Sequence, residues 1–303
     1  MFRNYMKIMS HRKLKVAIIG TGNIGTDLLI KIQKSNFLEC SLFTGKNPES
    51  NGIKRAQKMG VKTSYSSIQA IIDNPECCEI VVDATSADAH FKHAPILKKL
   101  NKFTIDMTPS RVGKMCIPII NLDMCLNEMN VNMITCGGQA TVPLISGIMQ
   151  VHPETKYIEV VSSISSKSAG IGTRNNIDEY TQTTSDAIIK FTDVPKAKAI
   201  VILNPAEPPI LMHNTIYAKI DKPNIKKLQQ KISEIVKVMQ KYIPGYNLIL
   251  NSIYENNRLT TMMEVIGLGD FLPAYAGNLD IINCAAIVVA EGYAKRKLQT
   301  NNV

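Results

Sequence analysis

The chain has 303 residues, 45% of them hydrophobic and 20% charged, which is ordinary for a globular protein and leaves room for two domains. No apolar run approaches the ~20 residues that a membrane helix needs, so we expect no spanning segment. The formal net charge of +10 comes from scattered lysines and arginines and does not by itself decide between nucleic acid, a membrane surface and an anionic small ligand. No nucleic-acid motif or aromatic stacking platform accompanies the charge, so a nucleic-acid role ranks last.

The seven cysteines form neither a Cys-x-x-Cys pair nor a cluster with zinc-site spacing. Free thiols in a reducing cytosol fit best, so we expect a cytoplasmic protein without a metal. Residues 1–12 are basic and lack the apolar core of a secretory signal, which predicts a leader outside the folded part. A mitochondrial transit peptide is the alternative for this segment.

A glycine-rich loop follows the apolar strand predicted at residues 13–19 and precedes a helical pattern over 26–34. Gly20 suits the tight turn, Gly22 the close approach of a pyrophosphate, and Gly25 the packing of helix on strand. This order of strand, loop and helix predicts a dinucleotide-binding domain. The predicted cofactor residues in the loop are Gly20, Thr21, Gly22, Asn23, Ile24 and Gly25.

The next predicted strand, residues 38–43, is not followed by the acid that usually binds the adenosine ribose. Asn47 stands there and can still hydrogen-bond a ribose hydroxyl, while Lys46 lowers the penalty for a 2′-phosphate. We therefore expect NAD as the cofactor, with NADP as an alternative.

Helices and strands alternate from residue 52 to residue 106, which favours a parallel sheet that binds ligands at the carboxyl ends of its strands. His90 and His93 lie three residues apart on one predicted helix. We see no acid or cysteine placed to help them, so we expect solvated or capping side chains rather than metal ligands.

Cys136 directly follows the strand predicted at residues 131–135 and precedes two glycines. If the chain turns there from a strand into a helix, free backbone N–H groups favour a thiolate over a thiol. That would make Cys136 a nucleophile, and a small buried hydrophobe is the alternative.

From residue 153 the pattern changes to strands and two long helices, which predicts an α+β second domain. The strand at 157–164 leads into a small-residue loop at 165–176. Such a loop exposes N–H donors and suits an anionic or carbonyl group, although composition alone also allows a flexible connector. The other predicted elements are strands at 198–203, 210–220, 248–254 and 258–266 and helices at 177–191, 224–243 and 281–297.

Six ordered segments carry a resemblance to a known family: GTGNIGTDL at 20–28, DMTPS at 106–110, ITCGGQAT at 134–141, SKSAGIGTRNNIDEYTQTTS at 166–185, NPAEPPILMHNT at 204–215 and YAGNLDI at 275–281. They resemble the acylating acetaldehyde dehydrogenases, NAD-dependent enzymes that form acetyl-CoA and partner a 4-hydroxy-2-oxovalerate aldolase in bacterial aromatic catabolism. The resemblance covers the chain from about Lys13 to Arg296.

This resemblance implies an α/β protein with an N-terminal Rossmann domain and a mixed α+β domain of the glyceraldehyde-3-phosphate dehydrogenase type. We expect the Rossmann domain at 13–135, a catalytic and dimerisation domain at 136–275, and a C-terminal helix at 276–303 that packs back on the first domain. A homodimer, complexed with the aldolase, is the expected assembly.

The resemblance further implies that Cys136 is the acyl-thioester nucleophile and that coenzyme A is the co-substrate. The thiolate adds to the aldehyde, hydride passes to the nicotinamide, and the thiol of coenzyme A takes the acyl group. Donors for the oxyanion are the N–H groups near Gly137 and Gly138 or the side chain of Asn176. The implied cofactor residues in the second half are Ser168, Ala169, Gly170, Ile171, Gly172, Thr173, Arg174, Asn175, Asn176 and Asn278.

Two positions depart from the family. The ribose acid is missing at Asn47, and Asn214 stands where the family usually has an aspartate proposed as a general base. An amide cannot take a proton at neutral pH, so His213, Glu207 or water must substitute, or coenzyme A must arrive deprotonated.

The leading hypothesis is thus a CoA-acylating acetaldehyde dehydrogenase with Cys136, Asn176 and Asn214 in its catalytic site. One alternative is a semialdehyde dehydrogenase of the same fold, in which phosphate resolves the thioester. Another is a non-catalytic or weakly active aldolase partner subunit.

Overall fold

The computed structural model describes residues 12–170, 174 and 177–300, so all but the last residue of the expected leader lies outside the described residues. The chain divides into two compact units. The first comprises Met1–Lys114, Leu122–Asn132 and Ala286–Val303, and the second Met115–Asn121 and Met133–Ala285.

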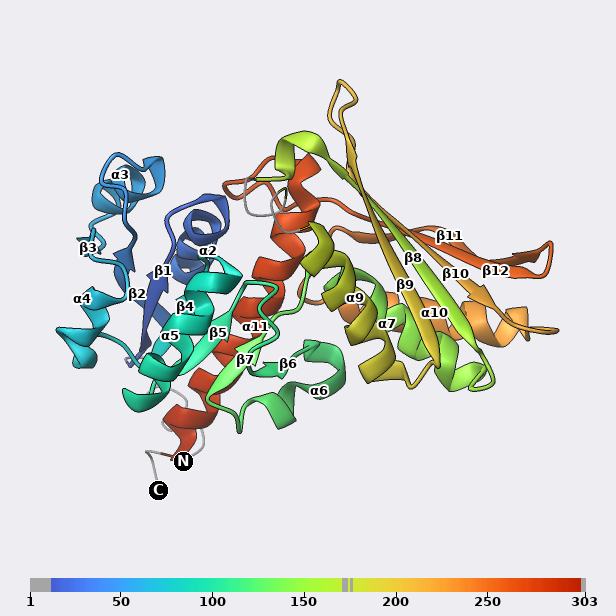
Figure 1. Ribbon diagram of the computed structural model, residues 1–303, viewed down its shortest axis with the longest axis horizontal. Coiled ribbons are helices and arrows are strands. Elements are labelled where there is room, and N and C mark those ends of the chain that lie inside the picture. The colour runs from blue at the N-terminus through green and yellow to red at the C-terminus, as the bar shows by residue number, and fades with distance from the viewer. Residues whose placement is uncertain (1–11, 171–173, 175–176, 301–303) are drawn as a thin grey trace, which may run out of the picture. The chain divides into compact units, whose positions relative to one another are not determined.

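The first unit is built on a sheet with the strand order β3-β2-β1-β4-β5-β7-β6 (Figure 1). The strand pairings from β3 to β7 are all parallel, as the alternation of helices and strands predicts. The direction of the strand order changes between β1 and β4, where dinucleotides bind in such sheets. The strands are β1 (Leu14–Ile19), β2 (Leu38–Thr44), β3 (Thr63–Ser64), β4 (Ile80–Asp83), β5 (Phe103–Asp106), β6 (Lys114–Met115) and β7 (Asn130–Asn132).

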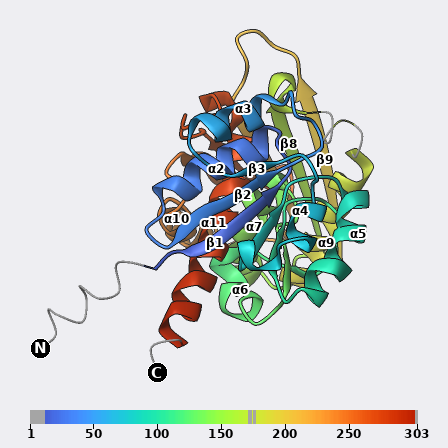
Figure 2. The same ribbon diagram turned by 90° about the vertical axis from the view of Figure 1, so that its left-hand side faces the viewer.

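Helices cover both faces of this sheet, which explains why its strands are almost wholly apolar (Figure 2). On one face Ile71 and Leu97 pack against Ala17 and Val81. On the other, Gly25 lies close to Ile18. The helices in or bordering this unit are α2 (Asn23–Lys34), α3 (Asn51–Lys58), α4 (Gln69–Ile72), the short η1 (Pro75–Cys77), α5 (Ala87–Lys99), α6 (Pro118–Cys125) and α11 (Gly277–Thr300).

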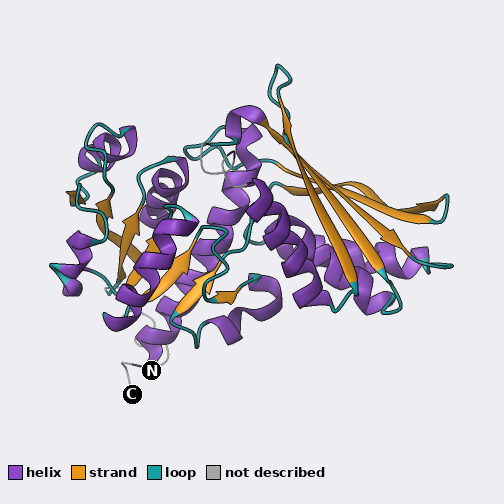
Figure 3. Ribbon diagram, in the orientation of Figure 1, coloured by secondary structure: helices purple, strands orange, loops and turns teal. Residues whose placement is uncertain are grey.

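The second unit contains a five-stranded sheet in the order β11-β12-β10-β8-β9. Among the described strands of this sheet, β8 and β9 pair in parallel and the other neighbours are antiparallel. Helices α7, α9 and α10 lie on one face of it, as Figure 3 shows. The elements are α7 (Cys136–Val151), β8 (Tyr157–Ser165), η2 (Ser166–Ser168), α9 (Ile177–Thr192), β9 (Lys196–Asn204), β10 (Met212–Lys219), α10 (Ile225–Met239), β11 (Tyr246–Glu255), β12 (Arg258–Val265) and η3 (Ala274–Ala276).

Alternation along the strands of the second sheet decides which side chains face these helices. In β8, Ile158, Val160 and Ile164 are buried while the residues between them are half-buried. The buried positions join one core cluster with residues of α7 and α10. The predicted α+β character is confirmed.

Two boundaries predicted from the sequence are wrong. The pattern predicts a loop at 118–122 and a helix at 123–129, whereas α6 begins at Pro118 and is kinked at Asn121. The strand predicted at 131–135 ends earlier, since β7 stops at Asn132. Proline suits the first turn of a helix, and the Asn121 side chain bonds the backbone of Ile117 and Met115, which stabilises this early start. Across residues 12–170, 174 and 177–300, no helix is both long and apolar enough to span a membrane.

Candidate active site

The three loop glycines occupy three different environments. Gly20 has φ +114°, and a Cβ there would collide with the carbonyl of Ala84. A Cβ on Gly25 would collide with the carbonyl oxygen of Gly20, whereas one on Gly22 would meet nothing within 4 Å. Gly22 also precedes α2 in extended conformation, and no described side chain caps that helix. The open space at Gly22 and the N-terminus of α2 fit a pyrophosphate.

The loop after β2 lies against the glycine loop. Ser50 donates a hydrogen bond of 3.0 Å to the carbonyl of Thr21, and Gly45 has no room for a side chain beside Thr21. Asn47 is exposed, and its Oδ1 accepts a 3.0 Å bond from the N–H of Glu49. The structure thus brings two predicted cofactor segments together.

The prediction that His90 and His93 are solvated or capping residues is wrong. Both are buried, and each bonds Oδ2 of Asp83 through Nδ1, at 2.9 and 2.8 Å. The acid that the sequence did not reveal lies at the end of β4, one loop before the helix that carries the histidines. Within the described part of the chain, no group of three or more His, Cys, Asp or Glu side chains is arranged to hold a metal.

A second buried carboxyl, Asp106, completes this polar cluster at the carboxyl ends of β4 and β5. Its Oδ2 lies 3.5 Å from Nε2 of His90 and accepts bonds from Ser110 and Asn132. Burial would raise the pKa of Asp83, but bonds from both histidines and Thr85 outweigh it and lower the pKa to about 2. For His90, burial works against the charge, but the bond to Asp83 and the charge of Asp106 raise the pKa of the imidazole.

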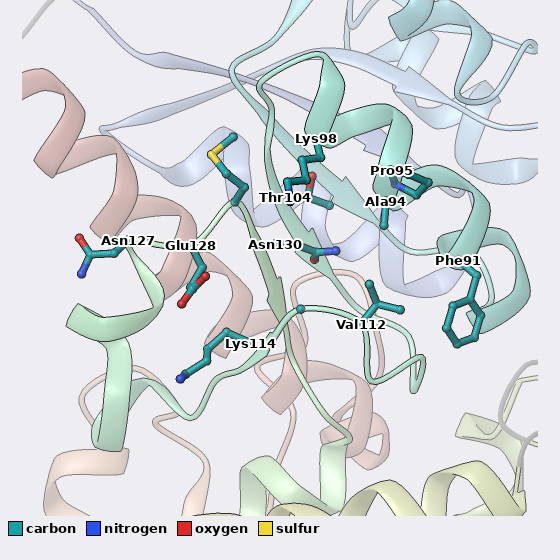
Figure 4. Close-up of a pocket in the computed structure, with 12 residues that line it drawn as sticks. Phe91, Ala94, Pro95, Lys98, Thr104, Val112, Lys114, Asn127, Glu128 and Asn130 are labelled. Atoms are coloured by element: carbon teal, nitrogen blue, oxygen red, sulfur yellow. The ribbon is translucent and has the colours of Figure 1, made fainter.

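A cavity of about 680 Å³ lies elsewhere in the first unit (Figure 4). Phe91, Pro95 and Lys98 of α5 line one side of it, and Lys114 and Glu128 the other. None of the predicted site residues lines this cavity.

Cys136 is the first residue of α7, as the predicted turn from strand to helix requires. Thr135 caps the helix, its Oγ1 accepting a 2.9 Å bond from the N–H of Gly138. Ile134, just before the cap, has φ +66°, which is rare for a β-branched residue and occurs where surrounding structure enforces it. The cysteine is half-buried.

The hydroxyl of Tyr180, from α9, occupies the space beside Cys136. It lies 3.3 Å from Sγ of Cys136 and accepts a 2.9 Å bond from the N–H of Gly137. A Cβ at position 137 would collide with this hydroxyl, so only glycine fits there while the tyrosine is in place.

Two expectations about this helix start are wrong. The N–H groups of Gly137 and Gly138 are already bound by Tyr180 and Thr135, so they are not open donors for an oxyanion. The pKa of Cys136 is also raised and not lowered, because burial outweighs the hydrogen bonds from Tyr180 and Gly137.

Asn214 lies in the same unit and is connected to this position through a serine. Ser162, on β8, donates a 2.7 Å bond to Oδ1 of Asn214, its cross-strand partner on β10. The hydroxyl of Ser162 also lies near that of Tyr180, because a Cβ at position 137 would meet both oxygens, and its hydrogen bonding lowers the pKa of the phenol. Nδ2 of Asn214 lies 3.1 Å from Sδ of Met263, the partner on β12. Asn214 is fully buried.

The proposed substitutes for the missing base lie elsewhere. His213 points to the opposite face of β10 from Asn214, 3.6 Å from Glu264. Glu207 is exposed and forms a 2.6 Å ion pair with Lys167. Neither replaces a carboxylate at position 214 in the geometry of this unit.

The described part of the second loop is held together internally. Ser168 donates to the carbonyl of Ser165, and Arg174 bonds the backbone of Ala169 and Ser166. The segment η2 contacts η3, which ends two residues before Asn278. Predicted site residues that lie outside the described residues are Ile171, Gly172, Thr173, Asn175 and Asn176.

Asn278 is 1% exposed, and its Oδ1 has no hydrogen-bond partner among the described residues. A buried acceptor without a partner is costly and calls for a partner outside the protein, such as a water, an ion or a ligand. This fits a donor group on a bound cofactor.

Sequence reasoning missed Tyr180 and Ser162. A signal existed for the serine, because Ser162 and Asn214 are polar residues at inward positions of otherwise apolar strands. Tyr180 had no such signal, since an aromatic residue on the buried side of a helix usually belongs to a core.

Residues 14–105 match "Oxidoreductase family, NAD-binding Rossmann fold", and residues 136–273 match "Prokaryotic acetaldehyde dehydrogenase, dimerisation". The acetaldehyde dehydrogenase of Pectobacterium atrosepticum is 53% identical over 93% of this chain and 96% of its own. Those of Spirochaeta aurantia and Geobacillus stearothermophilus are 52% and 50% identical, over 95% and 94% of this chain and 97% and 98% of theirs. In fold, aspartate semialdehyde dehydrogenase II of Vibrio cholerae is similar, with a TM-score of 0.60 at 12% identity, covering 94% of this chain and 99% of that one.

A nicotinamide-dinucleotide fold and relatives of this kind define an NAD-dependent oxidoreductase that acts on aldehydes. The similarity extends along nearly the whole chain at about half of all positions. The chain therefore belongs to the acetaldehyde dehydrogenase family. The predicted family and fold class are confirmed.

Proposed function

We propose that the protein is an acylating acetaldehyde dehydrogenase, which converts acetaldehyde, NAD and coenzyme A into acetyl-CoA and NADH. The observation that carries the proposal is the half-buried thiol of Cys136 at the first residue of α7, with the Tyr180 hydroxyl 3.3 Å from its sulfur. Relatives named acetaldehyde dehydrogenase support the choice of substrate.

The chemistry follows from the properties of sulfur. The Cys136 thiolate adds to the aldehyde carbonyl, and loss of hydride from the resulting thiohemiacetal leaves an acyl thioester. The thiol of coenzyme A, after losing its proton, attacks the thioester carbon, and the Cys136 thiolate leaves. NAD, when bound, supplies the hydride acceptor.

Several features support cofactor binding by the predicted residues. The space at Gly22 and the N-terminus of α2 suit a pyrophosphate. The partnerless Oδ1 of Asn278 suits a donor such as a carboxamide N–H. We assign the same role to the loop from Ser168 to Asn176, and Asn47 remains the candidate for the ribose, with NAD favoured over NADP.

The proton and the oxyanion need separate partners. Because Gly137 and Gly138 donate elsewhere, Asn176 remains the proposed oxyanion donor. Asn214 supports the site through Ser162 but cannot act as a base, so water takes the thiol proton or coenzyme A arrives as its thiolate.

The second unit is the proposed catalytic and dimerisation domain, in a homodimer, in keeping with the family match over residues 136–273. The 276–303 helix packing on the first domain, a complex with a 4-hydroxy-2-oxovalerate aldolase, a place in aromatic catabolism and a cytoplasmic location stay predictions.

The test is the formation of NADH with acetaldehyde plus coenzyme A, compared with acetaldehyde plus phosphate. We expect CoA-dependent turnover that Cys136→Ser abolishes and Cys40→Ser, which changes another half-buried thiol, retains. Strict phosphate dependence would instead identify the semialdehyde-type alternative, and no turnover with either would favour a non-catalytic subunit.

A further inference from the structure

The nucleophile in the second unit is joined to a chain of side chains that the proposed chemistry does not yet use. The chain runs from Cys136 to the hydroxyl of Tyr180, then to the hydroxyl of Ser162, which lies with it beside the position of a Cβ at 137, and ends at the buried amide of Asn214. Each link comes from a different element: α7, α9, β8 and β10. Buried polar groups lower stability unless each has a hydrogen-bond partner, so a connected row of them indicates either a satisfied network or a function.

The Tyr180 hydroxyl can donate only one hydrogen bond. A phenol has one hydrogen to donate, and its oxygen already accepts from the N–H of Gly137. Its own hydrogen can therefore point either to the sulfur of Cys136 or to the oxygen of Ser162. Burial raises the pKa of Tyr180 well above its ordinary value, so the phenol keeps this hydrogen.

The direction of that hydrogen is decided at the far end of the chain. When Ser162 donates to Oδ1 of Asn214, its oxygen is left to accept the hydrogen of Tyr180, and both hydroxyls point away from the sulfur. An amide carries an acceptor and a donor of nearly equal size, so a half-turn of the Asn214 side chain places Nδ2 at Ser162. Ser162 then donates to Tyr180, and Tyr180 donates to the sulfur.

We infer that Tyr180 is a catalytic residue whose hydroxyl donates a hydrogen bond to the Cys136 thiolate, and that Ser162 and Asn214 are positioning residues that set the direction of this bond. The inference rests on the proposed role of Cys136 as the nucleophile. When Cys136 is a neutral thiol, the hydroxyl hydrogens of Tyr180 and Ser162 point away from the sulfur. When it is a thiolate, they point toward the sulfur.

The hydrogen bond from Tyr180 supplies the side-chain donor to the Cys136 sulfur that the start of α7 does not itself provide. The N–H of Gly137 is shared with the Tyr180 oxygen and that of Gly138 bonds Thr135, so Tyr180 is the titratable side chain among the described residues that acts directly on the sulfur. A hydrogen bond to an ionised acceptor is about twice as strong as one between neutral groups. The same bond stabilises the thiolate when it attacks the aldehyde and again when it leaves the acyl group. No proton is transferred to Asn214.

The experiment is the pH dependence of Cys136 alkylation by iodoacetamide in the full chain, without NAD or coenzyme A. The modified peptide is quantified by mass spectrometry, so the other thiols do not interfere. The variants are Tyr180→Phe and Ser162→Ala. Tyr246→Phe is the matched control, because this buried tyrosine also bonds α7, at the carbonyl of Ala140, without approaching the sulfur.

We expect the midpoint of the alkylation profile to rise by about one pH unit in Tyr180→Phe and to stay unchanged in Tyr246→Phe. In Ser162→Ala it should fall, because the hydrogen of Tyr180 then has only the sulfur as its acceptor. An unchanged midpoint in Tyr180→Phe, or an equal rise in the control, would overturn the inference. If Tyr180→Phe fails to fold, as judged by circular dichroism, Ser162→Ala decides alone, and an unchanged midpoint there refutes the directional role. Because alkylation needs no substrate, it separates this inference from the CoA-dependent assay that tests the proposed function.

Discussion

Ser162 and Asn214 face each other across β8 and β10, and the serine donates a 2.7 Å hydrogen bond to the amide oxygen. The amide therefore receives the last hydrogen of a chain that begins at Cys136. It can bind that hydrogen but cannot take up a proton. Position 214 thus decides whether the chain only directs a hydrogen bond or also conducts a proton.

Replacing Asn214 by aspartate should add a proton acceptor to this chain. We expect the CoA-dependent oxidation of acetaldehyde at pH 7 to rise by roughly tenfold or more and its acid limb to move to lower pH, because the thiol proton then passes through Tyr180 and Ser162 to the carboxylate. The measurement is the rate between pH 5.5 and pH 9, about two units on each side of neutrality.

The matched control for this variant is Asn251→Asp, which adds the same charge to another asparagine of the second unit, bonded to Gln229 and Ser233. Its profile should equal that of the wild type. In a Tyr180→Phe background, Asn214→Asp should have no effect on the profile. A wild-type profile for Asn214→Asp alone would show that position 214 does not handle the proton.

Gly22→Ala and Gly25→Ala should affect different properties of the first unit. A methyl group at 22 meets no protein atom within 4 Å, so stability should stay within about 1 kcal/mol of the wild type while NAD affinity falls. A methyl group at 25 collides with the carbonyl of Gly20, so we expect a loss of about 1–3 kcal/mol. Thermal unfolding and NAD titration check both. An equal loss of stability in the two variants would contradict the open environment assigned to Gly22 and the closely packed one assigned to Gly25.

Asn278→Ala should weaken NAD binding more than it weakens the fold. The Oδ1 atom has no partner among the described residues, so its removal breaks no protein hydrogen bond of that atom, whereas a bound cofactor would lose one worth about 1 kcal/mol. We expect the dissociation constant for NAD, measured by calorimetry, to rise roughly fivefold to tenfold. Asn251→Ala is the control, since its Oδ1 is equally partnerless, and it should bind NAD normally.

The buried cluster around Asp83 should make stability depend on pH at both ends. Asp83 has a folded pKa of about 2, below its ordinary 3.8, so its contribution is complete above that ordinary value and disappears as pH falls through about 2. The pKa of His90 is raised above 6.5, so its contribution is complete below 6.5 and disappears as pH rises through the folded pKa.

The change that tests this cluster is Asp83→Asn, which leaves two buried imidazoles without their carboxylate. We expect a loss of about 3–5 kcal/mol near pH 6 and a flatter dependence at both ends, measured by urea unfolding. Asp73→Asn removes an exposed carboxylate bonded to Gln69 and should cost less than about 0.5 kcal/mol. Equal losses in the two variants would mean that the cluster is not stabilising.

The parts of the fold that local signals determine could be predicted from the sequence. The strand, glycine loop and α2 are adjacent in the chain, and so are the strand end and helix start around Cys136. The failures concern partners from separate elements. His90 and His93 were read without Asp83, because the acid belongs to the preceding strand.

Contacts that depend on strand register were harder still. Tyr180 is 44 residues from Cys136, and Ser162 is 52 from Asn214. Pairing Ser162 with Asn214 requires the exact alignment of β8 and β10, which turn lengths and packing set together. The raised pKa of Cys136 likewise depends on burial by residues far along the chain, whereas the sequence shows only the helix start.

The collision between a Cβ at position 137 and the Tyr180 hydroxyl has an evolutionary consequence. The two positions are 43 residues apart, yet position 137 cannot accept a side chain while Tyr180 keeps its hydroxyl. Among descendants of this sequence, alanine or serine at 137 should survive only where position 180 has already lost its hydroxyl. The order of substitutions is then constrained, with the tyrosine changing first.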